Sequence, residues 1–284
     1  MSKPQSKFPR KLALKVARLA AQNKIAELKI ELIKLIEASG TKRGTWGDNA
    51  NKILQWLNGE RDAPFTLFVK GNAKLPFYAF SALPLVTCPG KGECAKWCYS
   101  LKAWRCPAAF FRQLQNTILV KSQSTVLAQA FKNLPDNTDV RLYVDGDIDS
   151  LETMNYWFDL MNARKDLNVY GYSKSWELFS DFKKLGKSFP KNYTLNLSSG
   201  SKYENGRHSL LINTMDNLPV TRGTFSAVKS AKGDKTRQTA IANGLKNVFV
   251  CPGKCGECVK SKGKNIHACG SKLFKNVNIV IEAH

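Results

Sequence analysis

The order of apolar and polar positions divides the chain into a helical start and a longer region of alternating elements. Across residues 11–38 apolar side chains return at helical spacing among lysines, and Gly40 is expected to end this helix. A second helix is predicted over residues 47–57. We therefore expect a helical N-terminal extension over residues 1–62 and a cysteine-rich α/β domain over residues 63–284.

The short polar turn between these two helices gives them a superficial likeness to a DNA-reading helix-turn-helix. No recognition-helix pattern of Arg, Asn and Gln accompanies the turn. A helical cap that packs on the main domain and keeps its lysines in water is therefore the preferred interpretation.

After Pro64 short apolar runs alternate with amphipathic stretches. Strands are predicted over residues 77–85, 141–144, 167–172, 193–197, 225–228, 248–250 and 277–281. Helices are predicted over residues 110–131, 151–163, 176–185 and 236–245, while residues 209–215 fit either element. The alternation predicts an α/β fold with a mostly parallel sheet, either a TIM-like barrel or a partial barrel.

Polar or reactive side chains follow many of the predicted strands. In parallel α/β folds the carboxyl ends of the strands form the ligand-binding face. We therefore expect Asp145, Asp147, Ser173 and Lys174 to bind a cofactor, with both cysteine loops on the same face.

The alternation of Asp145, Asp147 and Asp149 could also hold a divalent cation. The spacing does not fit an EF-hand, because Tyr156 stands where the bidentate Glu is required. The preferred interpretation is that Asp147 caps the next helix or binds a polar ligand.

The composition is strongly basic, with 44 Lys and Arg against 22 Asp and Glu and a formal net charge of +22. This excess is far greater than solubility requires, and it predicts attraction to a polyanion, of which nucleic acid is the first candidate. The charge is uneven, because residues 136–166 are net acidic. A basic protein with no such partner remains the alternative.

The eight cysteines fall into two sets of four, and each set opens with Cys-Pro-Gly-Lys. Such compact spacing on Gly- and Lys-rich loops predicts metal ligation, with disulfides and buried free thiols as alternatives. The expected ligands are Cys88, Cys94, Cys98 and Cys106 in the first set and Cys251, Cys255, Cys258 and Cys269 in the second.

The start of the chain lacks the order of a signal peptide, and no apolar run is long enough to span a bilayer. We therefore expect a reducing cytoplasm and no membrane partner, which argues against disulfides.

Zinc and iron-sulfur clusters both accept four thiolates. Structural zinc usually takes two close pairs of cysteines, whereas each set here has three close cysteines and a distant fourth. That spacing, with Pro252 directly after Cys251, favours one or two 4Fe-4S clusters. Zinc is the alternative.

Several motifs resemble the phage family called gene product 88. They are Gly71-Asn72-Ala73-Lys74-Leu75, Phe80-Ser81-Ala82-Leu83-Pro84 leading to Thr87-Cys88-Pro89-Gly90, Cys98-Tyr99, Tyr170-Gly171-Tyr172-Ser173-Lys174-Ser175 and the Cys251-Pro252 loop. The resemblance covers roughly residues 65–284. It implies a phage protein of the bacterial host cytoplasm with a cysteine-rich core.

A second likeness is to radical S-adenosylmethionine enzymes, whose barrels carry three cysteines after the first strand. Cys94-Ala-Lys-Trp-Cys98 and Gly146-Asp147 are similar to parts of that pattern, so S-adenosylmethionine is a candidate cofactor. The gap of five residues between Cys88 and Cys94 departs from the usual Cys-x3-Cys-x2-Cys spacing. If Cys106 is a fourth ligand, no iron is left open.

Three functions remain. The first is an iron-sulfur protein that binds nucleic acid through its basic surface. The second is a radical-type redox enzyme, and the third is a zinc-stabilised binding protein without catalytic activity. The sequence leaves open whether the chain is an enzyme.

Overall fold

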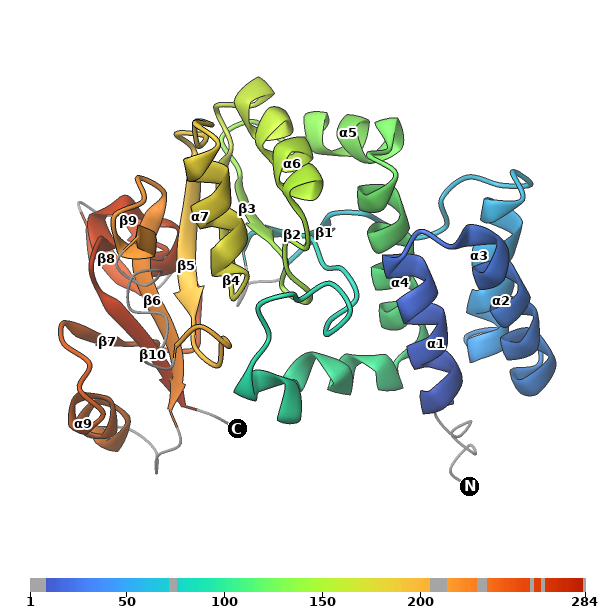
Figure 1. The fold of residues 1–284 in the computed structure, drawn as a ribbon, viewed down its shortest axis with the longest axis horizontal. Coiled ribbons are helices and arrows are strands. Elements are labelled where there is room, and N and C mark those ends of the chain that lie inside the picture. The colour runs from blue at the N-terminus through green and yellow to red at the C-terminus, as the bar shows by residue number, and fades with distance from the viewer. Residues whose placement is uncertain are drawn as a thin grey trace.

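The computed structural model describes residues 9–71, 76–204, 214–228, 234–255, 258–261 and 264–282 (Figure 1). An eight-stranded sheet lies at its centre in the order β1-β2-β3-β4-β5-β6-β10-β7. The strands are β1 Val69–Lys70, β2 Tyr78–Ala79, β3 Asp139–Leu142, β4 Asn168–Ser173, β5 Tyr193–Ser198, β6 Thr221–Val228, β7 Val248–Val250 and β10 Asn278–Glu282.

Neighbouring strands are parallel except for β1 and β2. Within the described ranges the end strands β1 and β7 do not pair with each other, so the sheet stays open. The predicted α/β fold with a mostly parallel sheet is confirmed, in the form of a partial TIM-like barrel. The sequence did not predict β1 or the antiparallel hairpin of β8 (Val259–Ser261) and β9 (Lys264–Ile266).

The helices are α1 Arg10–Ala21, α2 Ile25–Ser39, α3 Trp46–Leu57, α4 Pro107–Lys121, α5 Thr125–Lys132, α6 Leu151–Ala163, α7 Trp176–Lys184 and α9 Asp234–Ala242. Short 3-10 helices cover Glu93–Lys96, Tyr99–Arg105, Ala268–Gly270 and Lys272–Phe274. Most of the prediction over residues 209–215 lies outside the described residues.

Two predicted helices are each broken in two. The helix expected over residues 11–38 is α1 and α2, and the helix expected over residues 110–131 is α4 and α5. The breaks contain Asn23 and Gln123, whose φ angles of 55° and 48° are left-handed and incompatible with a continuing helix. The apolar spacing continues across both breaks, so it could not reveal them.

Helix α6 is capped at its N-terminus by Ser150, whose hydroxyl accepts a hydrogen bond of 3.2 Å from the Thr153 backbone N–H. The expectation that Asp147 caps this helix is therefore wrong. Its carboxylate has other partners, described below.

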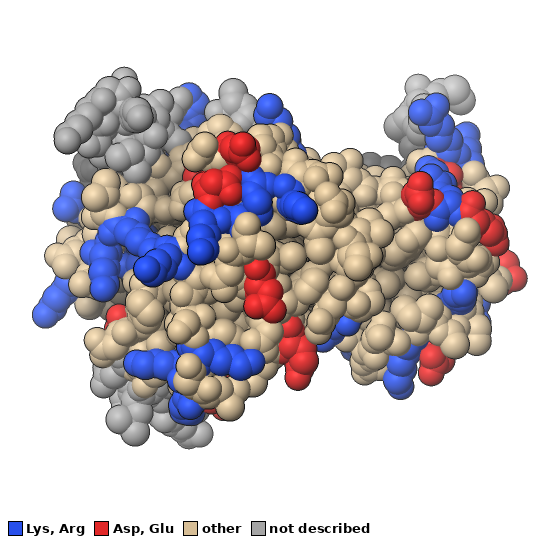
Figure 2. Space-filling model, turned by 90° about the horizontal axis from the view of Figure 1, so that it is seen from above, with Lys and Arg blue, Asp and Glu red and all other residues tan. Residues whose placement is uncertain are grey.

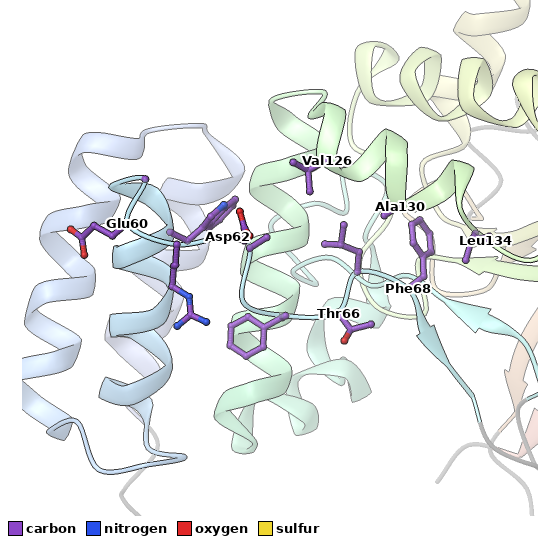
Figure 3. Close-up of a pocket in the computed structure, with 13 residues that line it drawn as sticks. Glu60, Asp62, Thr66, Phe68, Val126, Ala130 and Leu134 are labelled. Atoms are coloured by element: carbon purple, nitrogen blue, oxygen red, sulfur yellow. The ribbon is translucent and has the colours of Figure 1, made fainter.

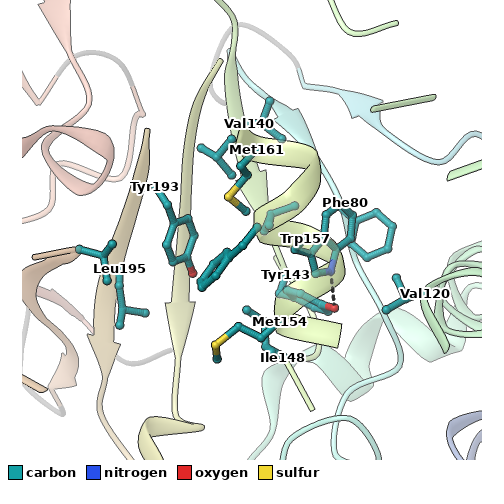
Figure 4. Close-up of a cluster of buried hydrophobic side chains, with 14 of the residues drawn as sticks. Phe80, Val120, Val140, Tyr143, Ile148, Met154, Trp157, Met161, Tyr193 and Leu195 are labelled. Atoms are coloured by element: carbon teal, nitrogen blue, oxygen red, sulfur yellow. Dashed lines mark hydrogen bonds between the residues drawn. The ribbon is translucent and has the colours of Figure 1, made fainter. Parts of the chain in front are cut away.

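The main core lies between the sheet and helices α6 and α7. Figure 4 shows the part of it beneath α6. Trp157 of α6 is fully buried in it, with the Phe80 ring 4.9 Å away, centroid to centroid. Its indole N–H donates a 2.9 Å hydrogen bond to the Tyr143 hydroxyl, which satisfies both buried polar groups. This layer holds β3, β4 and β5 together, the three strands whose ends carry the predicted site residues.

The N-terminal helices pack on α4, and they do so through a second core cluster. Trp46 of α3 lies 4.9 Å from the Phe110 ring and 5.5 Å from the Phe111 ring of α4, centroid to centroid. Because α3 buries this apolar face, the arrangement agrees with a packed helical cap. Among the described residues, no helix combines the length and the apolar character needed to cross a membrane.

Candidate functional site

Parallel pairing brings the carboxyl ends of β2, β3, β4, β5 and β7 to one edge of the sheet. This is the lower edge in Figure 1, toward which the β5 arrow points. The residues predicted to form a site lie at the ends of these strands or in the segments that follow them. Both cysteine loops and the segment with Asp145 therefore leave the sheet at the same edge, which is the edge where parallel α/β folds bind ligands.

The first cysteine loop is docked on this edge through glycines. The Gly92 N–H donates to the Gly200 carbonyl at 3.0 Å, and the Lys202 N–H donates to the Gly90 carbonyl at 3.0 Å. The Ser201 hydroxyl donates to the carbonyls of Gly90 and Lys174, at 3.2 Å and 3.0 Å. The loop that carries Cys88 to Cys98 is thus tied to the ends of β4 and β5.

Asp147 is a buried carboxylate, 4 % exposed, that joins two strand ends. One oxygen accepts a 2.8 Å hydrogen bond from the Lys174 N–H, and the other accepts a 2.8 Å bond from the Ile148 N–H. Burial raises the pKa of Asp147, and the Lys174 N–H opposes that rise. The contacts among the described residues give Asp147 a positioning role at this edge.

Lys174 and Ser173 follow β4 directly. The Lys174 ammonium donates a 2.6 Å hydrogen bond to the Ser198 hydroxyl at the end of β5. Ser173 is buried, and its hydroxyl accepts from the Ser175 N–H at 2.9 Å. Of these two residues, Lys174 therefore brings a positive charge to the site. Ser173 stabilises the turn that follows β4.

Asp145 is held from α4. The Gln113 amide donates to an Asp145 carboxylate oxygen at 2.9 Å, and the Trp104 indole N–H donates to the Gln113 carbonyl oxygen at 2.8 Å. Burial raises the pKa of Asp145, against hydrogen bonds from Ser100 and the charge of Arg141. The two carboxylates thus have different partners: Asp147 accepts from backbone N–H groups, and Asp145 accepts from the Gln113 side chain. Sequence reasoning missed Gln113, because an amide inside a helix carries no signal of its partner.

All eight cysteines are free thiols, and Cys106 alone among them is exposed. Burial raises the pKa of Cys88 to about 12, and the nearby Asp147 charge adds to the rise. Cys98 lies within electrostatic range of both Cys88 and Cys94. Cys98 is therefore close enough to influence both other cysteines of this loop.

In the second set, Cys251 follows β7 and Cys269 lies beside Asn196 of β5 and Tyr172 of β4. Burial raises the pKa of Cys269 to about 11, and a hydrogen bond with Tyr172 opposes the rise. Cys251 acts electrostatically on Cys269 and is itself affected by Cys258. The Asn196 amide fixes the turn by donating to the Cys269 carbonyl at 2.9 Å.

Thiols are the right kind of donor for a zinc or iron-sulfur centre. As they stand in the described part of the chain, no three His, Cys, Asp or Glu side chains converge closely enough to hold a metal ion. Metal ligation by the eight cysteines stays a prediction.

Two clefts are open at the surface. One of about 610 Å³ borders the second cysteine loop, and its lining includes Cys251, Thr236 and Arg237. The other, of about 800 Å³, lies between α3 and α5, away from the cysteines, and Phe68 and Val126 line it (Figure 3). Only the first adjoins predicted site residues.

The surface charge extends beyond the site. Figure 2 views the molecule from the side opposite the site edge, and Lys and Arg gather on the left half of that view. On the first cysteine loop the exposed cations are Lys91, Lys96, Lys102 and Arg105.

No curated protein and no solved structure matches the chain. Residues 44–270 match the family described as Gene product 88. The match begins at α3, so it reaches further into the helical start than the motifs quoted from residue 65 onward. Because it spans well over half of the 284 residues, the chain belongs to the gene product 88 family, a phage gene-product family.

Proposed function

We propose that the chain is an iron-sulfur protein that binds nucleic acid through the loop carrying its first cysteine set. The observation behind the proposal is the exposed surface of that loop. It presents four cations and the Trp97 ring, which is 50 % exposed, next to Cys98. Basic side chains interleaved with an exposed aromatic ring are typical of surfaces on which single-stranded bases stack.

The loop is well placed for this role because its backbone is fixed. Its glycines lie against the ends of β4 and β5, and the Tyr99 hydroxyl donates to the Val144 carbonyl at 3.1 Å. Lys96 pairs with Glu93 at 2.8 Å, but both side chains are mostly exposed, so that pair contributes little. Lys91, Lys102 and Arg105 remain to contact phosphates.

The iron-sulfur part of the proposal is supported by the spacing of Cys88, Cys94 and Cys98 along one loop and by the electrostatic effect of Cys98 on Cys88, which Asp147 and Lys174 also influence. A bound cluster would supply electron transfer at this edge. The residues of the chain would orient it, with Asp147 fixing the turn after β4 and the Lys174 ammonium providing a positive charge.

Binding should depend on Trp97 and on the loop lysines. Trp97→Ala should weaken binding of a single-stranded oligonucleotide by about tenfold, because a stacked base contributes about 1–3 kcal/mol. The double variant Lys91→Ala, Lys102→Ala should lower the slope of log affinity against log salt by about 1.4, since single strands give about 0.7 per phosphate contact. Fluorescence anisotropy over a salt series measures both.

Leu185→Ala is the matched control for Trp97→Ala, because Leu185 is 60 % exposed on the end of another helix. It should bind like the wild type. Absent binding, or binding that is insensitive to salt, would contradict the proposed nucleic-acid partner.

A radical-type redox enzyme is the second candidate. It is favoured by the position of Cys88, which is close enough to Asp147 and Lys174 for both charges to act on it. After anaerobic purification, Cys98→Ala should lose most of its iron and sulfide. Cys106→Ala should retain them, because Cys106 is exposed. Retention would leave one iron open, and cleavage of S-adenosylmethionine by the reduced protein would then support the enzyme.

Zinc without sulfide in the wild type would contradict both iron-sulfur functions. It would instead support the zinc-stabilised binding protein. The nucleic-acid experiment remains informative in that case, because it does not depend on the metal.

A further inference from the structure

Arg141 of β3 projects from the face of the sheet opposite α6 and α7. Its strand neighbours Val140 and Leu142 belong to the main core, so alternation places Arg141 on the other face. Its guanidinium carbon lies 4.5 Å from the centroid of the Tyr172 ring, in cation-π contact. The strand thus carries a charged side chain into the region between the two cysteine loops.

This guanidinium has no polar partner among the residues that the structure describes. Its Nε is buried and has no hydrogen-bond acceptor, and the described residues give the side chain no ion pair or hydrogen bond. The residue as a whole is half-buried, so part of it stays accessible. A buried donor without an acceptor is rare, because nothing in the protein compensates for its lost contact with water.

Arg222, on the same face, shows what a purely structural arginine looks like here. Its guanidinium donates to the Asn196 carbonyl oxygen at 2.6 Å and to the Val277 carbonyl at 2.6 Å, with further bonds to Phe274 and Thr224. All three nitrogens of that guanidinium donate hydrogen bonds. Arg141 differs, because nothing in the described fold accounts for its donors.

Among the described residues, no carboxylate forms an ion pair with Arg141. The side chains on which its charge acts most are the phenol rings of Tyr172, Tyr99 and Tyr170. Asp145 is the carboxylate within electrostatic range, but it is committed to Gln113 and forms no ion pair with Arg141 among the described residues. A buried guanidinium without an ion-pair partner is stabilised further when an anion binds to it.

We propose that Arg141 binds an oxoanion, the carboxylate or phosphate group of a small ligand, between the two cysteine loops. The planar guanidinium fork matches both groups bidentately. The Tyr172 ring holds the fork from one side. This binding site goes beyond the proposed function and requires neither a bound metal nor a nucleic acid.

The probes are inorganic phosphate and acetate, compared with chloride at equal ionic strength. Calorimetric titration and thermal melting should show binding and a rise in Tm that grows with probe concentration. Arg141→Gln should weaken the binding at least about tenfold, while Arg141→Lys should retain part of it because the charge remains. Arg18→Gln, an exposed arginine on α1, is the control and should leave binding unchanged.

The two probes distinguish the sources of the anion. Preference for phosphate indicates a phosphorylated ligand, and preference for acetate indicates a carboxylate ligand. The proposal would be overturned if Arg141→Gln bound phosphate and acetate as tightly as the wild type does. It would also be overturned if the wild type bound neither probe.

A second measurement avoids dependence on a folded variant. Phenylglyoxal modifies accessible guanidinium groups, and peptide mass spectrometry reports the rate at Arg141 in the wild-type protein. Phosphate or acetate should slow modification of Arg141 several-fold and leave Arg18 unchanged. An unaffected rate at Arg141 would refute the site.

Discussion

Gly90→Ala should detach the first cysteine loop from the end of β4. A Cβ at position 90 would lie 1.7 Å from the Lys174 carbonyl oxygen and 2.6 Å from the Ser175 nitrogen. Both are backbone atoms, so no side-chain rotation relieves the overlap, and the loop must move. Overpacking of this kind destabilises by about 1–3 kcal/mol or more.

Urea denaturation and limited proteolysis of the loop measure this change. We expect faster cleavage between residues 88 and 106 and a loss of nucleic-acid affinity at least as large as that of Trp97→Ala. Lys91→Ala is the neighbouring control, because Lys91 is exposed and should leave stability within about 0.5 kcal/mol of the wild type. Wild-type stability and binding in Gly90→Ala would contradict the docking described here.

Asp147→Ala should destabilise the fold by about 3 kcal/mol or more. The change removes the acceptor of the Lys174 and Ile148 N–H groups, and each buried donor left unpaired costs about 1–3 kcal/mol. Asp147→Asn should cost less, because one oxygen acceptor remains. Thermal and chemical denaturation would rank the variants.

Asp159→Ala provides the matched control, since Asp159 lies exposed on α6 within the same acidic segment. Its stability should stay within about 0.5 kcal/mol of the wild type. If Asp147→Ala were equally mild, the carboxylate would not be joining the ends of β3 and β4.

The strands and their shared edge could be predicted because buried parallel strands are short apolar runs between turn residues. Val248–Val250 and Leu151–Ala163 match the prediction to the residue. The breaks at Asn23 and Gln123 could not be predicted, since they depend on one residue's backbone angle within an unbroken apolar pattern.

For the site, the positions of the residues could be predicted, but their contacts could not. Position after a strand was enough to select Asp145, Asp147 and Lys174. It did not reveal that Asp147 is occupied by backbone N–H groups, or that Gln113 holds Asp145. Arg141 escaped notice because a single cation in a strand gives no sign of lacking partners.

Helix α4 joins two parts of the molecule that are unrelated along the sequence. Phe110 and Phe111 pack against Trp46 of the helical start, and Gln113, less than one turn further along, holds the Asp145 carboxylate. A displacement of α3 should therefore move α4 and, with it, the Gln113 partner of Asp145. A fragment that starts after residue 62 would expose those aromatic rings to water, so a fragment meant to keep Asp145 in place should begin ahead of Trp46.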